Sequence, residues 1–243
     1  MFSFDRRTLY IITIVLFVVA LMQYATDTER LVSLLLTAPG VLIAITFHEF
    51  AHGFAAYKLG DDTAKNDGRL SLNPLAHLDP VGTLMLLVAG FGWGKPVEVN
   101  PRNYNRNISV EKADAIVSIA GPLMNFILAF VFSIIYCAIL KFAPSFLYMQ
   151  LGQIIIKMIG YTIVVNIGLG TFNLIPLPPL DGSKVIMPFL PLNVKQWISA
   201  NQYIFYIVFL VIYVTGIASW IITPAINAIS NGILSVATFI FGL

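Results

Sequence analysis

Two histidines lie four residues apart, with a glutamate between them, in the segment His48-Glu49-Phe50-Ala51-His52. Residues four apart share one face of a helix, so both imidazoles can reach one ion while Glu49 projects close beside them. In this H-E-x-x-H arrangement the two histidines bind zinc and the glutamate acts on a water molecule. A pattern of five residues also arises by chance, so its surroundings decide how it is interpreted.

The segment lies near the end of a long apolar stretch, Leu31–Tyr57. At about 1.5 Å per residue, His48 is about 26 Å into a helix that starts at Leu31, within the hydrocarbon but near its cytoplasmic side. Ionisable side chains inside a membrane are costly and are functional by default. The alternative is that His48, Glu49 and His52 only cap a span at the interface, which predicts no third metal ligand at membrane depth.

A third ligand is expected, because a catalytic zinc ion is usually held by three protein side chains. Asp181 is a candidate, since it follows prolines that break a helix and precedes Gly182, which permits a sharp reversal of the chain. Such a segment, Asn173–Gly182, can bring Asp181 to the level of the two histidines. It can equally be a cytoplasmic turn with a solvated aspartate, and spacing alone does not choose between the two.

Composition indicates that these residues belong to a membrane protein. The 243 residues are 58% hydrophobic and 11% charged, with a mean hydropathy of +0.85, whereas soluble domains are about 25% charged. A net charge of +2 is no indication of nucleic-acid binding. Cys137 is the only cysteine, which excludes an intrachain disulfide and a thiolate metal cluster. Three histidines are too few for a di-iron membrane oxidase.

Several apolar stretches approach the roughly 20 residues that a membrane-spanning helix needs. We therefore expect an all-α polytopic membrane protein, with about six transmembrane helices, in which residues 1–243 form a single integral membrane domain. The last two stretches are separated by Thr215-Gly216, which can be a tight turn or an interruption within one long segment. The predicted spans are Leu9–Tyr24, Leu31–Tyr57, Ala115–Leu140, Tyr148–Ile175, Trp197–Val214 and Ile217–Leu243.

The distribution of Lys and Arg predicts the orientation of these spans. If six spans start from a cytoplasmic N-terminus, most of the 14 basic residues fall on the cytoplasmic face, many of them in the connection Lys58–Lys112. We expect a multi-pass protein of the cell membrane with both termini in the cytoplasm. The first stretch follows Arg6-Arg7 and can be taken for a signal peptide, but its length and the lack of a small-residue cleavage site favour a retained anchor.

The connection Lys58–Lys112 also carries two elements that are not spans. Val81–Phe91 is apolar but too short to cross a bilayer, which is typical of a re-entrant or interfacial segment. Pro96–Val99 alternates in polarity after a glycine cluster, which predicts a strand or hairpin. We expect this element to lie against the bundle, where a strand edge can hydrogen-bond an unwound substrate. His77 lies in a turn-rich part of the same connection, and we expect it to make local hydrogen bonds.

Three motifs follow one another along the chain. They are His48-Glu49-Phe50-Ala51-His52, Gly121-Pro122-Leu123-Met124-Asn125, and Asn173-Leu174-Ile175-Pro176 running into Leu180-Asp181-Gly182. In this order they resemble the motifs of the site-2 proteases, a family of intramembrane metalloproteases. The resemblance covers about residues 31–188 and extends to the short prokaryotic members, which carry no PDZ or CBS domain.

The resemblance implies one zinc ion held by His48, His52 and Asp181, with Glu49 as the catalytic base. It also implies that the amide of Asn125 contacts the substrate. Because a buried amide needs a partner, hydrogen bonding to a neighbouring helix is the other role open to Asn125.

The function implied is that of a zinc-dependent endopeptidase that cleaves a transmembrane segment of single-span membrane proteins near the cytoplasmic side. Its expected partners are those substrates and the lipid bilayer, without nucleic acid, and the oligomeric state stays open. A metal transporter and a catalytically silent scaffold are the alternatives. A transporter needs ligands along a route, whereas these converge at one place. A silent scaffold is expected to have lost one of the four residues.

Overall fold

The computed structural model describes residues 24–89 and 92–243, together with 11, 14–15, 17–19 and 22. Within these residues the chain forms helices and no sheet, as expected for an all-α protein. Short 3-10 turns lie at Pro74–Ala76, Pro101–Asn103, Pro144–Tyr148 and Met187–Phe189. The helices are α2 (Thr28–Lys58), α3 (Thr63–Asn66), α4 (Pro80–Ala89), α5 (Val110–Phe142), α6 (Gln150–Asn173), α7 (Asp181–Ile186), α8 (Leu192–Ala200), α9 (Gln202–Val214) and α10 (Ile217–Phe241).

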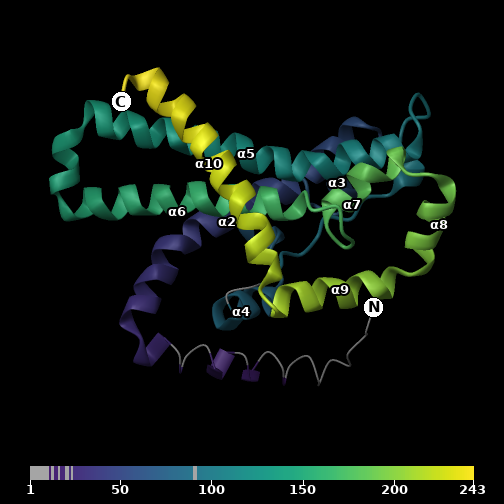
Figure 1. The fold of residues 1–243 in the computed structure, drawn as a ribbon, viewed down its shortest axis with the longest axis horizontal. Coiled ribbons are helices and arrows are strands. Elements are labelled where there is room, and N and C mark those ends of the chain that lie inside the picture. Colours follow the sequence, from purple (N-terminus) through teal and green to yellow (C-terminus); the bar gives the residue numbers. More distant parts are fainter. Residues whose placement is uncertain (1–10, 12–13, 16, 20–21, 23, 90–91) are drawn as a thin grey trace.

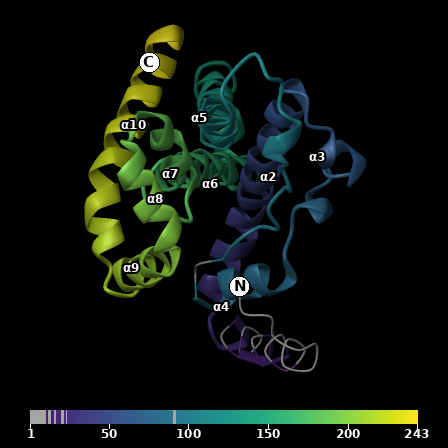
Figure 2. The same cartoon turned by 90° about the vertical axis from the view of Figure 1, so that its right-hand side faces the viewer.

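Helices α2, α5 and α6 pack against one another and form the core of the molecule. α5 and α6 are antiparallel and lie side by side, and α2 crosses them at a steep angle (Figure 1). After a quarter turn, the pair α5–α6 is seen between α2 and α10 (Figure 2). The helix that carries both histidines therefore meets the two other core helices, which can supply partners to its polar side chains.

Helix α2 is continuous through the H-E-x-x-H segment. Its first turn is capped by Asp27, whose carboxylate accepts the N–H of Arg30 at 2.9 Å, and Glu29 lies where the helix dipole favours a negative charge. Pro39 is inside the helix and does not end it. The helix thus runs on beyond His52, and the four-residue spacing of the histidines is kept on one face.

The core contains two apolar clusters with polar residues between them. Ala56, Tyr104, Ala113 and Val117 form one cluster, and Ala129, Ile163 and Ile167 form the other. Between these positions, the core helices bury His48, Asn125 and Asn166. Burial of a polar side chain is costly unless it finds a hydrogen-bond partner. These three residues are therefore candidates for a functional site.

Four helices are long and apolar enough to cross a membrane, judged by length and composition. They lie near four of the predicted spans, those at residues 31–57, 115–140, 148–175 and 217–243. These four are Thr28–Lys58, Val110–Phe142, Gln150–Asn173 and Ile222–Phe241.

The other two predicted spans are not confirmed. Trp197–Val214 is divided between α8 and α9, which separate at Asn201, and α9 has 13 residues. A helix of that length extends about 20 Å, short of the roughly 30 Å of hydrocarbon. A turn at Gly216, with φ of 74°, then separates α9 from α10. Half of the residues of the predicted span Leu9–Tyr24 lie outside the described residues.

The predicted strand at Pro96–Val99 is not confirmed either. The segment Lys95–Asn100 is irregular, and the one ladder contact among the described residues is an antiparallel bridge between Leu78 and Gly94. The hydrogen bonds of this segment go largely to side chains rather than to a neighbouring strand, so no sheet forms. The preceding apolar run forms α4, whose ten residues are too few to cross a bilayer; a re-entrant position stays a prediction.

Candidate metal centre and active site

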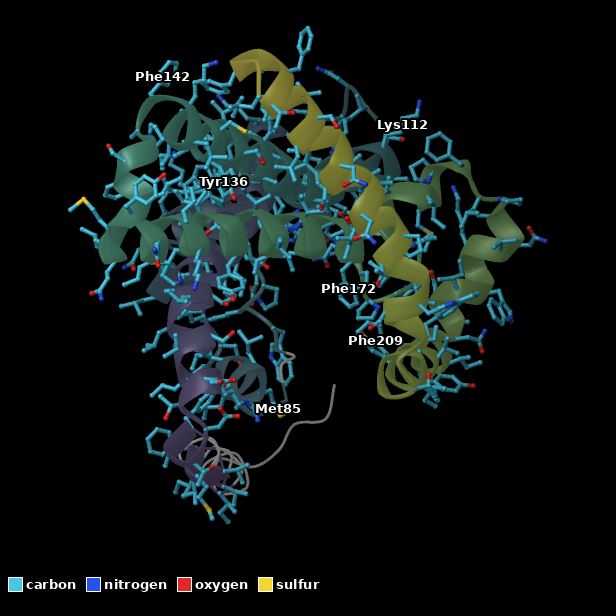
Figure 3. All side chains as sticks on the ribbon, turned by 60° about the vertical axis from the view of Figure 1, so that its left-hand side comes forward. Met85, Lys112, Tyr136, Phe142, Phe172 and Phe209 are labelled. Carbon is cyan, nitrogen blue, oxygen red and sulfur yellow. The ribbon has the colours of Figure 1, made fainter. Side chains whose placement is uncertain are left out.

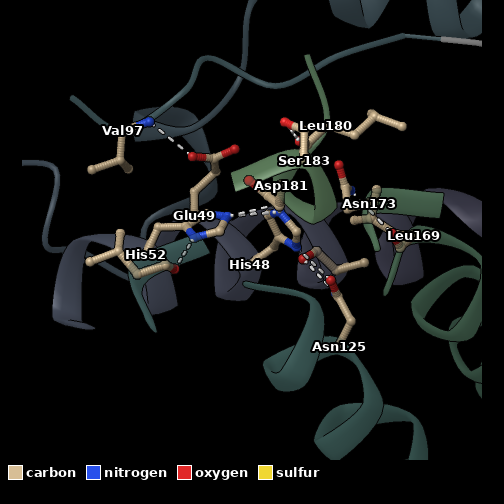
Figure 4. Close-up of polar contacts among 12 residues, drawn as sticks. His48, Glu49, His52, Val97, Asn125, Leu169, Asn173, Leu180, Asp181 and Ser183 are labelled. Atoms are coloured by element: carbon tan, nitrogen blue, oxygen red, sulfur yellow. Dashed lines mark hydrogen bonds and ion pairs between the residues drawn. The ribbon is translucent and has the colours of Figure 1, made fainter. Parts of the chain in front are cut away.

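Three possible ligand atoms meet where α2 approaches α7. Nε2 of His48 and Nε2 of His52 are 3.0 Å apart, and each lies 3.2 Å from Oδ2 of Asp181 (Figure 4). His48 and His52 project from α2, and Asp181 is the first residue of α7. The structure therefore brings together three residues that the sequence singled out, across a separation of more than a hundred positions.

The spacing of these atoms suits a tetrahedral zinc ion. Zinc bonds of about 2.0–2.1 Å place neighbouring ligands of a tetrahedron about 3.3 Å apart, within a few tenths of an ångström of the separations observed between His48, His52 and Asp181. Three protein ligands leave the fourth position open, which is the arrangement of catalytic zinc sites.

The Nδ1 atom of each histidine makes a hydrogen bond, and these two bonds leave both Nε2 lone pairs facing Asp181. Nδ1 of His52 lies 2.7 Å from the carbonyl oxygen of Val117. A carbonyl can only accept a hydrogen bond, so Nδ1 of His52 carries the proton and Nε2 does not. By the same reasoning, Nδ1 of His48 donates to Oδ1 of Asn125 at 2.6 Å. Two imidazole lone pairs and a carboxylate oxygen thus converge without a donor, which calls for a cation.

The amide of Asn125 is oriented by two other core residues. Its Nδ2 donates to the carbonyl oxygen of Ala44 at 3.1 Å and to Oδ1 of Asn166 at 3.0 Å. Because the Ala44 carbonyl can only accept, the nitrogen must face it and the oxygen must face His48. Asn166 in turn donates to Thr162 within α6. All three core helices therefore help to set the orientation of the His48 ring.

Close approach of α5 to the histidines depends on Gly121. A Cβ atom at this position would lie 2.4 Å from Nε2 of His52 and 2.8 Å from Cε1 of His48. No real side chain is tolerated at such distances. The absence of a side chain at Gly121 lets α5 lie directly against the two imidazoles.

The possible ligands and Glu49 line one cavity of about 640 Å³. Oε2 of Glu49 accepts the backbone N–H of Val97 at 2.9 Å, so the segment Lys95–Asn100 passes beside this carboxylate. On another side, Phe172 of α6 and Phe209 of α9 make an edge-to-face contact with ring centroids 6.0 Å apart (Figure 3). Residues of α5 and of the stretch Pro179–Lys184 complete the walls, so parts of the chain that are far apart in sequence line the cavity together.

A second cavity, of about 720 Å³, adjoins the first and is almost wholly apolar. It lies between α2, α4, α6 and α10, and it shares Ile45, Trp93 and Phe172 with the first cavity. An apolar hollow beside a cavity that also contains two imidazoles and two carboxylates suits a ligand that is mostly apolar but is acted on at a polar point.

Comparison with known proteins agrees with this geometry. The sequence model of peptidase family M50 matches residues 36–216. The chain belongs to this family, that of the site-2 proteases. The protease is 40% identical to YwhC of Bacillus subtilis strain 168, whose name describes a zinc metalloprotease, over 83% of this chain and 90% of that one.

Two further relatives also bear the names of zinc metalloproteases. Rip2 of Mycolicibacterium smegmatis is 32% identical over 86% of the protease and 76% of its own length. MJ0611 of Methanocaldococcus jannaschii is 29% identical over 78% of the protease and 89% of its own length. No solved structure matches the chain at a significant level. The protease is accordingly a metalloendopeptidase with zinc as its cofactor.

The structure also places His77, which the sequence predicts to make local hydrogen bonds. His77 is buried in its loop, where Nε2 donates to the carbonyl oxygen of Ser71 at 2.7 Å, away from the group of possible ligands. Asn166 of α6, for which a hydrogen bond to a neighbouring helix is expected of a buried amide, accepts from Asn125 of α5. The role of the Val117 carbonyl was not predicted. Every residue has a backbone carbonyl, so the type of residue at position 117 gives no sign of this role. The four-residue spacing between Gly121 and Asn125 was a usable signal for Gly121, since it places both on the face of α5 that meets α2.

Proposed function

We propose that this protease hydrolyses a peptide bond within a transmembrane segment of single-span membrane proteins, with His48, His52 and Asp181 as zinc ligands and Glu49 as catalytic base. The observation that carries the proposal is the convergence of three ligand atoms within 3.2 Å of one another among helices long enough to cross a membrane. A site built there acts on peptide bonds at membrane depth.

The chain's own residues supply the proton transfers. When bound, zinc supplies a Lewis acid that polarises the scissile carbonyl and makes water more acidic. Glu49 accepts a proton from the attacking water and donates it to the leaving amide nitrogen as the C–N bond breaks. Oε2 of Glu49 already accepts from Val97, whereas Oε1 has no hydrogen-bond partner among the described residues. Oε1 is therefore the atom that takes the proton.

A helical substrate must unwind before it can be cut, because its carbonyls are hidden in i→i−4 hydrogen bonds. The segment Lys95–Asn100 is suited to receive the unwound chain. Val97 and Val99 line the active-site cavity, and the carbonyl of Val97, both backbone groups of Glu98 and those of Val99 have no hydrogen-bond partner among the described residues. Pairing between this free backbone and the substrate backbone would hold the scissile carbonyl near the metal centre.

The second cavity supports the choice of an apolar substrate. Its walls are mostly Leu, Ile, Val and Phe, with a few Ser and Thr hydroxyls. The part of a transmembrane helix that remains helical can lie there, since the shared residues Ile45 and Phe172 join the two cavities.

Asn125 remains a predicted substrate contact. In the structure its amide is fully buried and contacts His48, Ala44 and Asn166. To donate to the scissile carbonyl, Nδ2 of Asn125 has to give up its hydrogen bond to Ala44 or to Asn166.

The protease domain is proposed to extend over residues 1–243, with its catalytic core at about 31–188. It is a multi-pass protein of the cell membrane, with both termini and the metal centre near the cytoplasmic face. Basic residues in the connection Lys58–Lys112 support this orientation. Single cysteines placed at the exposed positions Asn105 and Ser145 in a Cys137→Ala background test it. Only the cysteine at 105 should react with an impermeant thiol reagent added to the cytoplasmic side, and the reverse pattern would invert the topology.

Cleavage of a single-span membrane protein in proteoliposomes tests the proposed function. Wild-type protease should cut the substrate within its span. Glu49→Gln should retain one zinc ion per chain and lose activity by about 10²–10⁴-fold, the usual contribution of a general base. Glu29→Gln, a change at an exposed glutamate in the first turn of the same helix, is the matched control and should leave the rate unchanged.

Two outcomes would contradict the proposal. Wild-type activity in Glu49→Gln would remove Glu49 as the base. Cleavage of soluble peptides without any cleavage of membrane-embedded substrates would remove the proposed substrate class.

A further inference from the structure

Two buried charged side chains outside the metal centre hold the segment that passes beside it. Arg69 is only 8% exposed. It donates to the backbone carbonyls of Ala76, Lys95 and Pro96, and no carboxylate among the described residues forms an ion pair with it. A buried guanidinium with no counter-ion is costly. Three carbonyls accept its hydrogen bonds, and two of them, those of Lys95 and Pro96, lie at the start of the segment Lys95–Asn100.

Asp61 holds the other end of the segment Lys95–Asn100. It is fully buried, and Oδ2 accepts the backbone N–H of Asn100 at 2.6 Å, while Oδ1 accepts from the side chain of Asn103 at 2.9 Å and from Thr63. Burial by itself would raise the pKa of Asp61, but these hydrogen bonds lower it below the ordinary value. Asp61 is therefore a carboxylate that acts through backbone and amide N–H groups.

The two anchors leave only a few residues between them, and those residues border the active site. Arg69 holds the carbonyls of Lys95 and Pro96, and Asp61 holds the N–H of Asn100. Between these contacts, the N–H of Val97 reaches Glu49. The free backbone groups of Val97–Val99 lie in this same short stretch. A loop with unpaired backbone groups would otherwise sample many conformations.

The anchors also connect this segment to the helix that carries the catalytic residues. Asp61 lies three residues beyond the end of α2, and Arg69 follows the short helix α3. The backbone of this connection is tied to the last turn of α2, since the N–H of Asp61 donates to the carbonyl of Ala56. The N–H of Arg69 donates to the carbonyl of Ala64 in α3, which packs against α2. The position of Val97–Val99 relative to Glu49 is thereby set from α2 itself.

We propose that Arg69 and Asp61 are positioning residues that hold the segment Lys95–Asn100 extended beside Glu49, so that its free backbone can pair with the substrate. The inference rests on the proposed function, since it assumes that a peptide backbone is bound there. Neither side chain touches the reacting atoms, and both act through the segment that they hold.

Arg69→Lys and Asp61→Asn test this role with little change in volume. Lysine keeps the charge but lacks the planar fork that reaches several carbonyls, and asparagine replaces one acceptor oxygen with a donor. Each variant should raise KM for the single-span substrate about tenfold, with kcat changed less, because substrate binding is lost while the chemical groups remain. Asp67→Asn and Arg102→Lys, at exposed positions of the same connection, are the matched controls and should keep the wild-type KM.

Hydrogen exchange gives a readout that does not depend on activity. In both variants, amides of the segment Lys95–Asn100 should exchange about tenfold faster, while those of α2 and the zinc content stay as in wild type. Unchanged KM and unchanged exchange would overturn the inference. Loss of zinc, or faster exchange across α2, would also overturn it, because the two residues would then stabilise the whole fold.

The same experiment separates this inference from the function on which it rests. If wild type cuts the substrate and Glu49→Gln does not, the proposed function stands whatever Arg69→Lys and Asp61→Asn do. If wild type fails to cut any membrane-embedded substrate, the proposed function fails, and faster exchange in the two variants would still report the anchoring of the segment.

Discussion

The carboxamide oxygen of Asn125 lies 2.6 Å from Nδ1 of His48, and both side chains are buried in the middle of the helix bundle. Metal-binding histidines commonly donate their second ring N–H to a carboxylate, a carbonyl or water. Here a neutral amide fills that place, held in turn by Ala44 and Asn166. It fixes the tautomer and the direction of the His48 ring without adding a charge to the core.

Replacement of Asn125 by alanine should therefore weaken zinc binding. Loss of the acceptor frees the His48 ring, and zinc affinity should fall about 10–100-fold, as is typical when the outer partner of a ligand is removed. Competition with a chelator measures the affinity. Ser133→Ala is the matched control, since Ser133 is buried in α5 and bonds only to Ala129 in its own helix. Wild-type zinc affinity with impaired cleavage would assign Asn125 to substrate contact instead.

Addition of a single methyl group at Gly121 should displace the histidines. The Cβ atom of Gly121→Ala would lie 2.4 Å from Nε2 of His52, and the ring cannot turn away without losing its bond to the Val117 carbonyl. We expect zinc affinity to fall at least about tenfold, measured as zinc retained after dialysis. Gly160→Ala in α6 would place its Cβ more than 4 Å from the atoms of other elements in the described part of the chain, and this variant should bind zinc normally. Equal retention by both variants would show that α5 can shift.

Removal of the metal should lower stability as well as activity. A ligand present at about 100 times its Kd adds about 2.7 kcal/mol to the free energy of unfolding. Chelation should therefore lower the Tm of the wild type, and added zinc should restore both Tm and cleavage. His48→Ala and Asp181→Ala should show a Tm that does not respond to either treatment. A chelator-sensitive Tm in Asp181→Ala would mean that Asp181 is not a required ligand.

Proline at Val99 should impair cleavage without loss of zinc. Proline removes a backbone N–H, and the N–H of Val99 has no partner among the described residues, so little native structure depends on it. If the substrate pairs with this segment, the rate should fall about tenfold or more. Val99→Ala keeps the N–H and serves as the control. Val97→Pro would act differently, because it removes the N–H that Glu49 accepts and leaves that of Val99 in place. Full activity of Val99→Pro would exclude pairing at the N–H of Val99.

Much of the site was predictable because it depends on local spacing. His48 and His52 are four residues apart, and a continuous helix has to place them on one face whatever the rest of the chain does. The apolar lengths of α2, α5, α6 and α10 likewise follow from composition, since about 20 apolar residues suffice to cross a bilayer. Asp181 was only a candidate by spacing, and its pairing with the histidines came from the resemblance.

Other features were decided by tertiary contacts that leave no mark on residue type. Pro96–Val99 has the alternation of a strand, yet its neighbours are side chains rather than a strand edge, so no sheet forms.

The sequence by itself determined that the protein is helical and apolar, and that two imidazoles and a glutamate share one turn of helix. Only the tertiary structure decided what meets them: the amide of Asn125, the carbonyl of Val117, the bare surface at Gly121, and a segment held by Arg69 and Asp61. Helical period and apolar length act over a few residues. Contacts between residues far apart in the chain depend on how whole helices pack, and backbone groups, which all residues share, make many of them.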